Sequence, residues 1–286
     1  MNATSSKPPI PLRDALDIED LCQNSPCDAD IALGSFWLGS RRSFESRLVK
    51  VFKACVPTSE FEPHISRLCR FYANLVRQRT SEEGIDWVVR VLGSGETQVD
   101  AMRPQTLLVH VLCSILGARN GSDLFLRSQT RSPMRVVDRL AGAEALKARL
   151  RYVAQDLFIR PGRLAGNVLL LDDICNTGAS TRVHASALKR FAGAQRVVTV
   201  NLAATMFSRG RDGRGMLQLD VSGLAEHPAL GEVWTDGSGV VHTREDCPSA
   251  AKPAACDVRF MAERSARLCA ECMASPAPEK KWWKVW

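Results

Sequence analysis

The segment that decides the fold is Val168-Leu-Leu-Leu-Asp-Asp-Ile-Cys-Asn-Thr-Gly-Ala-Ser-Thr181. Its first four residues form a short, uniformly apolar run, which is typical of a strand covered on both faces in a parallel sheet. A helix is expected from Ala179 to Ala192, because apolar residues recur there at helical spacing and Gly193 provides a stop. The turn between them therefore joins the carboxyl end of a strand to the amino end of a helix.

Such a turn favours an anion, because unpaired backbone N–H groups and the helix dipole meet there. Gly178 lets the backbone approach a ligand closely. Asp172 and Asp173 only accept hydrogen bonds when ionised, so they suit the vicinal hydroxyls of a sugar better than its phosphate. The pattern indicates a ribose 5-phosphate site. The alternative is an ordinary strand, turn and capped helix with two solvated carboxylates.

At these residues the chain resembles the type I phosphoribosyltransferases, whose signature is four apolar residues, two acidic residues, two apolar residues and a Thr-Thr-Gly-x-Thr type of loop. The resemblance implies an α/β fold with a mostly parallel twisted sheet flanked by helices. It implies that Asp172 and Asp173 act at the catalytic centre on the ribose hydroxyls of phosphoribosyl pyrophosphate (PRPP), with Mg²⁺ as cofactor. The 5-phosphate would be held by Asn176, Thr177, Gly178, Ala179, Ser180 and Thr181. Cys175 and Asn176 depart from the usual residue types but keep the size.

A second strand, glycine loop and helix unit precedes this one. Residues Trp87 to Leu92 predict a strand, Gly93-Ser94-Gly95-Glu96 a loop, and about Met102 to Leu116 a helix. In the family the equivalent loop binds pyrophosphate through backbone N–H groups, so Gly93, Ser94 and Gly95 are candidates for that role; a plain turn is the alternative. Further strands are expected at Leu124–Leu126 and Arg196–Ala204, and the alternation predicts a right-handed, mostly parallel sheet.

Between these units, residues 119–163 carry ten Lys or Arg against four Asp or Glu, an excess of six in a chain whose formal net charge is +7. Positive charge beside a phosphate loop attracts a polyanionic ligand; a solvated basic face or a nucleic-acid patch is the alternative. Gln105 and the stretch Arg127-Ser-Gln-Thr-Arg131 resemble features of the competence-associated ComF branch of the family. Arg127 and Arg131 are the candidate phosphate contacts in this segment.

The C-terminal part predicts a small zinc-ribbon-like module. Residues Trp234 to Val241 indicate a hairpin, and a Cys-x-x-Cys follows at Cys269 and Cys272. The favoured structural Zn²⁺ ligands are His242, Cys247, Cys269 and Cys272, with Cys256 able to replace His242; unliganded cysteines in a loop are the alternative. The usual ComF arrangement places its zinc finger before the transferase domain, whereas this candidate comes after it.

Composition and hydropathy divide the chain into five segments. They are a flexible N-terminal arm (1–35), a helical cover segment (36–82), the phosphoribosyltransferase-like domain (83–208), the zinc-binding module (209–276) and a basic, aromatic tail (277–286). No run of 18 apolar residues exists and the N-terminus has no hydrophobic region. We therefore expect a cytoplasmic protein without a transmembrane segment; its oligomeric state is unknown.

Two functions agree with these features. The first is a phosphoribosyltransferase (a glycosyltransferase of nucleotide metabolism) that transfers phosphoribosyl from PRPP to a base or amine and releases pyrophosphate. The second is a non-catalytic, ComF-like protein that binds a nucleotide in single-stranded DNA handling or DNA uptake, with single-stranded DNA or a DNA-processing protein as partner. The Lys and Trp residues of the tail could bind such a partner. A P-loop kinase or a dinucleotide enzyme is excluded, because neither glycine pattern is present.

Overall fold

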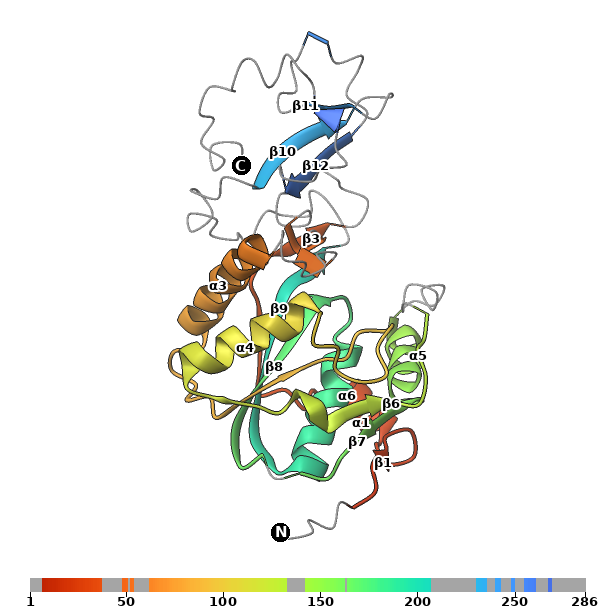
Figure 1. Ribbon diagram of the computed structural model, residues 1–286. Coiled ribbons are helices and arrows are strands. Elements are labelled where there is room, and N and C mark those ends of the chain that lie inside the picture. The colour runs from red at the N-terminus through yellow and green to blue at the C-terminus, as the bar shows by residue number, and fades with distance from the viewer. Residues whose placement is uncertain are drawn as a thin grey trace.

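The computed structural model describes residues 7–37, 48–50, 52–53, 62–132, 142–162 and 164–206, and in the C-terminal part 230–235, 240–242, 248–249, 255–260 and 267–268. In these residues a parallel sheet has the strand order β2-β9-β8-β4-β5, with β3 also paired to β9 (Figure 1). Its strands are β2 (Ala29–Ala32), β3 (Ser35–Trp37), β4 (Trp87–Arg90), β5 (Arg119–Asn120), β8 (Gly166–Cys175) and β9 (Ala194–Met206). All strand pairs of this sheet are parallel, which confirms the predicted mostly parallel α/β architecture.

The central strand β8 is covered on both faces. Because successive side chains of a strand point to opposite faces, Leu169 and Leu171 belong to one hydrophobic core and Val168 and Leu170 to the other. All four are at most 1% exposed. The uniformly apolar run is therefore explained by burial on both sides of the sheet.

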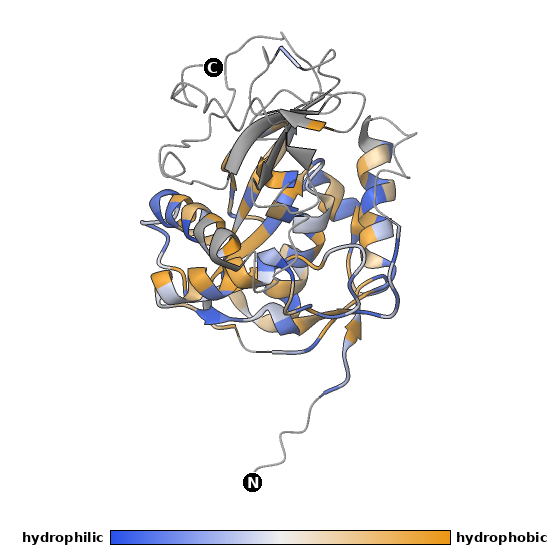
Figure 2. Ribbon diagram, turned by 45° about the horizontal axis from the view of Figure 1, so that its top comes forward, coloured by the Kyte–Doolittle hydropathy of each residue, from blue (hydrophilic) through white to orange (hydrophobic). Residues whose placement is uncertain are grey.

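Helices form the outer layers (Figures 1 and 2). The first core contains buried residues of α3 (Glu62–Arg79) and α4 (Pro104–Leu116). The second contains buried residues of α1 (Ile18–Gln23), α5 (Gly142–Ala154) and α6 (Ala179–Ala187). Figure 2 shows the hydrophobic residues gathered on the strands and on the inner sides of the helices. The predicted helix after β8 is confirmed: α6 continues as a π-helical turn, Leu188–Ala192, and ends at Gly193 with φ +80°.

A small antiparallel sheet lies beside the parallel one. It has the order β1-β7-β6, with β1 (Ile10–Pro11), β6 (Phe125–Arg127) and β7 (Leu157–Ile159). The strand expected near Leu124–Leu126 therefore exists, but it belongs to this second sheet, because it pairs with β7, antiparallel, at Leu126 and Phe158.

The N-terminal region differs from the flexible arm expected for residues 1–35. Residues 10–37 contain two strands of the parallel sheet and one of the antiparallel sheet. Leu12 and Leu21 are buried in the second core at 0% and 3% exposure. The physical reason is that these scattered apolar residues pack on a core formed by residues far along the chain. The local sequence is dominated by the polar residues between them and therefore predicts a loose segment.

The C-terminal residues that the structure describes form a sheet of order β12-β10-β11-β13. Its strands are β10 (Leu230–Thr235), β11 (Val240–His242), β12 (Ala255–Phe260) and β13 (Arg267–Leu268). The expected hairpin is present, since β10 and β11 are antiparallel with Trp234 opposite His242. Trp234 also stands opposite Cys256 of β12.

Helices that the structure describes are all too short or too polar to cross a membrane.

The packing of the N-terminal region can be tested at Leu12. We expect Leu12→Ala to lower the free energy of unfolding by about 2 to 5 kcal/mol, because it leaves a cavity in the second core. Chemical denaturation would measure this change. Lys7→Ala, at an exposed position, is the control and should have little effect. An equally small effect of both substitutions would contradict the packed arrangement.

Candidate functional site

The loops after β4 and β8 leave the sheet at the same edge and then diverge. The two strands are parallel neighbours, with Arg90 opposite Leu171. The chain runs from β4 through α4 to β5, on one side of the pair, and from β8 through α6 to β9, on the other side. Helices α4 and α6 also contribute to opposite cores. Such a reversal of strand order opens a crevice at the carboxyl ends of the two strands, where α/β proteins bind ligands.

The acidic pair lies in this crevice because β8 is longer than β4. Strand β4 ends at Arg90, and its last contact with β8 is the hydrogen bond from the N–H of Val91 to the carbonyl of Leu171, at 2.9 Å. Strand β8 continues to Cys175, and among the described strands its last residues pair with β9. Asp172 and Asp173 therefore lie beyond the last residue that β4 pairs with, and both residues are half-buried.

The two carboxylates have different partners. Asp173 forms an ion pair with Lys53, with 2.6 Å between Oδ2 and Nζ. It also accepts a hydrogen bond of 3.3 Å from the side-chain amide of Gln105. Asp172 accepts the backbone N–H of Asp173 at 2.8 Å. Lys53 therefore neutralises one charge of the pair, and residues from three separate parts of the chain meet at this point.

The pair does not hold two full charges easily. Removal from water, followed by the neighbouring charge of Asp173, raises the pKa of Asp172 to about 7. The pair therefore keeps a proton to a higher pH than two separate carboxylates would. Such a pair can both accept hydrogen bonds from sugar hydroxyls and donate one to them.

The turn Asn176–Thr181 places the amino end of α6 beside the acidic pair. Gly178 has φ +72°, a left-handed conformation that favours glycine, and it is the residue at which the helix starts. The hydroxyl of Thr181 donates to the carbonyl of Gly178 at 2.9 Å. Within the described chain, no side chain caps this helix end. The first backbone N–H groups of α6 are therefore free to bind an anion.

The Gly93–Gly95 loop is held by charged side chains beneath it. Arg90 and Glu96 form a two-fold ion pair at 2.5 and 2.9 Å, both almost fully buried, and Glu96 also accepts the N–H of Gly93 at 2.7 Å. In the part of the chain that the structure describes, the N–H groups of Ser94 and Gly95 donate to no protein acceptor. These two amides are the ones open to a ligand.

The two arginines expected to contact phosphate lie below this loop. The side chain of Arg127 is buried, donates to the carbonyls of Leu92 and Gly93, and lies 3.5 Å from the carboxylate of Asp156. Arg131 donates to the carbonyl of Tyr152 at 2.8 Å. In this structure their donors face protein groups, so a direct phosphate contact stays a prediction that requires these bonds to open.

Cys175, the unusual residue of the signature, is a protonated thiol here. Burial and then the charges of Asp172 and Asp30 raise its pKa to about 12. The thiolate, which is the reactive form, is therefore suppressed.

The zinc hypothesis falls largely outside the described residues. Cys247, Cys269 and Cys272 are not among them, while His242 lies on β11 and Cys256 on β12. Among the described residues there is no group of three or more His, Cys, Asp or Glu side chains that could hold a metal ion. The zinc site stays a prediction.

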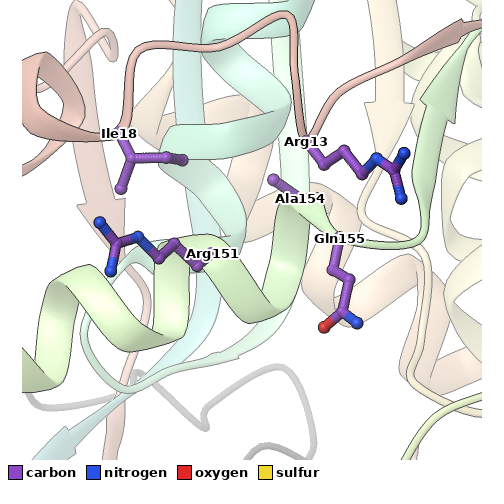
Figure 3. Close-up of a pocket in the computed structure, with 5 residues that line it drawn as sticks. All are labelled: Arg13, Ile18, Arg151, Ala154 and Gln155. Atoms are coloured by element: carbon purple, nitrogen blue, oxygen red, sulfur yellow. The ribbon is translucent and has the colours of Figure 1, made fainter.

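A cavity of about 300 Å³ lies elsewhere, between the N-terminal segment and α5 (Figure 3). It is lined by Arg13, Ile18, Arg151, Ala154 and Gln155. Arg13 and Arg151 are both exposed and interact with Asp14 and Glu19. This cavity contains none of the residues that the sequence singled out, and we assign it no role in the site.

Three residues of the site were missed by the sequence interpretation. Lys53, Glu96 and Asp156 each pair with a charged residue that the crevice or its loops contain. Glu96 directly follows Gly95, so its position in the glycine loop was a usable signal. Asp156 begins the short stretch Asp156-Leu-Phe158 that resembles the ComF branch, but nothing in the sequence indicated its pairing with Arg127, and no local pattern marks Lys53.

Comparisons with known proteins give only distant matches. No protein-family model and no curated protein matches the sequence. Among solved structures, an adenine phosphoribosyltransferase matches with 18% identity and a TM-score of 0.32, over 51% of this chain and 71% of that one. Adenine phosphoribosyltransferase from Saccharomyces cerevisiae, complexed with D-2,5-dideoxy-2,5-imino-altritol 1,6-bisphosphate and adenine, matches with 16% identity and a TM-score of 0.29, over 49% and 66%. Matches at this distance transfer no activity, so we base the function on the residues of the crevice.

The raised pKa of Asp172 predicts a pH-dependent stability difference. Its folded-state pKa of about 7 exceeds the ordinary 3.8, so the stability that its protonated form contributes is lost as pH rises towards 7. Asp172→Asn removes the ionisable group. The stability of this variant minus that of wild type should therefore be larger at pH 8 than at pH 5. Thermal unfolding midpoints at both pH values would measure this. Asp123→Asn, at an exposed position, is the control; a pH-independent difference for Asp172→Asn would contradict the shift.

Proposed function

We propose that the crevice between β4 and β8 binds the phosphoribosyl group of PRPP or of a nucleotide, and that the protein transfers it to a base or amine. The observation that carries the proposal is the position of Asp172, Asp173 and the uncapped amino end of α6 at the reversal of strand order. A sugar phosphate needs donors for its phosphate and acceptors for its hydroxyls, and the crevice offers these side by side.

The charges of the crevice determine the orientation of the ligand, that is, which part of the crevice binds the phosphate and which binds the ribose hydroxyls. The phosphate dianion belongs at the amino end of α6, where backbone N–H groups and the hydroxyls of Thr177 and Ser180 can donate. The opposite orientation would place the phosphate against Asp172 and Asp173, where like charges repel. The ribose hydroxyls therefore belong at the acidic pair, with Gln105 and Lys53 beside Asp173.

In the proposed reaction the bond from the anomeric carbon to pyrophosphate breaks, and the nitrogen of the base or amine forms the new bond to that carbon and loses a proton. Positive charge develops on the sugar ring as pyrophosphate leaves. The free amides of Ser94 and Gly95 lie at the carboxyl end of β4, next to β8, where they can receive the departing pyrophosphate. With the ribose hydroxyls at the acidic pair, the oxygens of Asp172 and Asp173 would lie beside the ring, where the negative charge that the pair retains would stabilise the transition state.

Mg²⁺ is the cofactor that the family resemblance implies. Asp172 and Asp173 provide carboxylate oxygens of the kind that Mg²⁺ takes, and at Oδ2 of Asp173 the metal would replace the ion pair with Lys53. Bound Mg²⁺ would supply positive charge to the pyrophosphate oxygens.

Binding without turnover is the second candidate. It is supported by the ion pair of Lys53 with Asp173, which a ligand would have to share or displace, and by the resemblance of Gln105 to the ComF branch. A role in single-stranded DNA handling, a structural Zn²⁺ and a cytoplasmic location belong to this proposal as further predictions. The tail at 280–286 lies outside the described residues.

Ligand binding tests the shared part of both candidates. We expect wild type to bind ribose 5-phosphate, and PRPP with Mg²⁺, in isothermal titration calorimetry. Asp173→Ala should weaken binding by about 10 to 100-fold, because hydrogen bonds from the sugar hydroxyls to a charged acceptor are lost. Asp123→Ala is a matched control outside the crevice. Failure of wild type to bind any sugar phosphate at millimolar concentration would overturn the proposal.

Turnover separates the two candidates. A transferase should release pyrophosphate from PRPP and Mg²⁺ in the presence of a suitable acceptor from a panel of purine and pyrimidine bases and amines. A coupled pyrophosphate assay would detect this release. Binding of PRPP without release for any acceptor would favour the non-catalytic candidate.

A further inference from the structure

Arg127 lies in β6, outside the parallel sheet, yet it reaches the loop after β4. Its side chain is buried and the whole residue is 3% exposed. One guanidinium nitrogen donates to the carbonyl of Gly93, and the other donates to that of Leu92 at 3.1 Å. The antiparallel sheet is thereby tied to the backbone of the Gly93–Gly95 loop by two charge-assisted hydrogen bonds.

Main-chain N–H groups at the end of β6 and just after it also bind this loop. The N–H of Arg131 donates to the carbonyl of Ser94 at 2.9 Å, and the N–H of Arg127 donates to that of Thr97 at 2.7 Å. The carbonyls of Leu92, Gly93 and Ser94 are therefore all bound by the same segment, residues 127–131. Three consecutive peptide groups of the loop are thus held from one neighbour, and the N–H of Glu96 adds a hydrogen bond of 3.1 Å to the carbonyl of Gly93 from within the loop.

The orientation of these carbonyls decides where the amides point. In a trans peptide the N–H points opposite to the C=O, and the described residues contain no cis peptide bond. Because the carbonyls of Gly93 and Ser94 bind the 127–131 segment, the N–H groups of Ser94 and Gly95 point away from it. Two successive free amides of this kind form a concavity that binds an anion.

Glu96 prevents the third amide from joining them. The N–H of Gly93 donates to Glu96, and a side chain at Gly93 would place a Cβ 2.7 Å from that carboxylate. Burial by itself would raise the pKa of Glu96, but the hydrogen bonds and charge of Arg90 outweigh it and lower the pKa. Arg90 thus balances the charge of Glu96. Because Glu96 occupies the N–H of Gly93, the N–H groups of Ser94 and Gly95 are the two in this loop that can bind a ligand.

The charge beneath the loop is positive. Arg127 and Arg131 lie 3.5 and 3.8 Å from the same oxygen of Asp156, so two guanidinium groups share one carboxylate. Burial and then the charge of Arg131 lower the pKa of Arg127 to about 10, which leaves it protonated at neutral pH. The surplus positive charge adds long-range attraction for a polyanion at the two amides.

We propose that Arg127 is a positioning residue that orients the backbone amides of Ser94 and Gly95 towards the pyrophosphate group of the ligand. The inference rests on the proposed function and deepens it, since it assigns the pyrophosphate end to amides held from the antiparallel sheet. In this role Arg127 acts through the loop, and the positioning role replaces the direct phosphate contact that was expected of it. A guanidinium is needed, because its planar fork donates to two carbonyls at once and a lysine ammonium does not match that geometry.

The test measures how two probes, inorganic pyrophosphate and ribose 5-phosphate, bind to wild type and to the variants Arg127→Lys and Arg160→Lys. The control is matched, because Arg160 also donates to a backbone carbonyl, that of Asp123 at 2.8 Å, away from the loop. By calorimetry with Mg²⁺, Arg127→Lys should weaken binding of inorganic pyrophosphate by about tenfold, the equivalent of one charge-assisted hydrogen bond. Binding of ribose 5-phosphate should change less than about twofold, which lies within the scatter of such measured contributions. Arg160→Lys should change neither. An equal loss for both probes, or no loss for pyrophosphate, would overturn the positioning role.

A second measurement needs no variant. In nuclear magnetic resonance spectra of wild type, pyrophosphate should shift the amide signals of Ser94 and Gly95, whereas ribose 5-phosphate should shift those of Ala179 to Thr181. If ribose 5-phosphate binds but pyrophosphate moves neither loop amide, the positioning inference fails and the proposed function stands. If ribose 5-phosphate does not bind, the proposed function itself fails.

Discussion

The hydrogen-bonded pairing of β4 with β8 is the constraint on which the candidate site depends. Four residues of each strand are in register, and the chain then leaves the two strands in opposite directions. Backbone pairing therefore brings an acidic strand end, a helix amino end and a glycine loop to one edge of the sheet. None of these groups would define a sugar phosphate site alone, because each needs the others to match a ligand that is anionic at both ends and polar between them.

Charged residues around the crevice are buried at a cost in desolvation. Arg90 with Glu96, and Arg127 and Arg131 with Asp156, lie in places where an apolar side chain would be cheaper to bury. Both groups of charged residues contact the backbone of the Gly93–Gly95 loop: Glu96 accepts the N–H of Gly93, and Arg127 and Arg131 donate to the carbonyls of Gly93 and Ser94. Their contribution is a fixed loop geometry, which a pre-organised anion site requires.

Local signals explain which predictions hold. The strand at 168–171 and the helix at 179–192 were predicted because burial on both faces and helical periodicity leave a mark on consecutive residues. The N-terminal strands were not predicted, because β2 and β3 are short and obtain their hydrogen bonds from β9, more than 160 residues away. Arg127 was assigned to phosphate from its charge and from the resemblance of its segment to the ComF branch, and only its surroundings show that its donors face protein carbonyls.

The sequence by itself determined the chemistry that is available: two adjacent carboxylates, a glycine turn at a helix start and a second glycine loop in one alternating α/β pattern. The tertiary structure decided how these groups are used. It paired Lys53 with Asp173, raised the pKa of Asp172 to about 7 and turned the carbonyls of Leu92 and Gly93 towards Arg127. The reason is that ionisation and peptide orientation depend on neighbours brought together by folding, and such neighbours leave no periodic pattern in the chain.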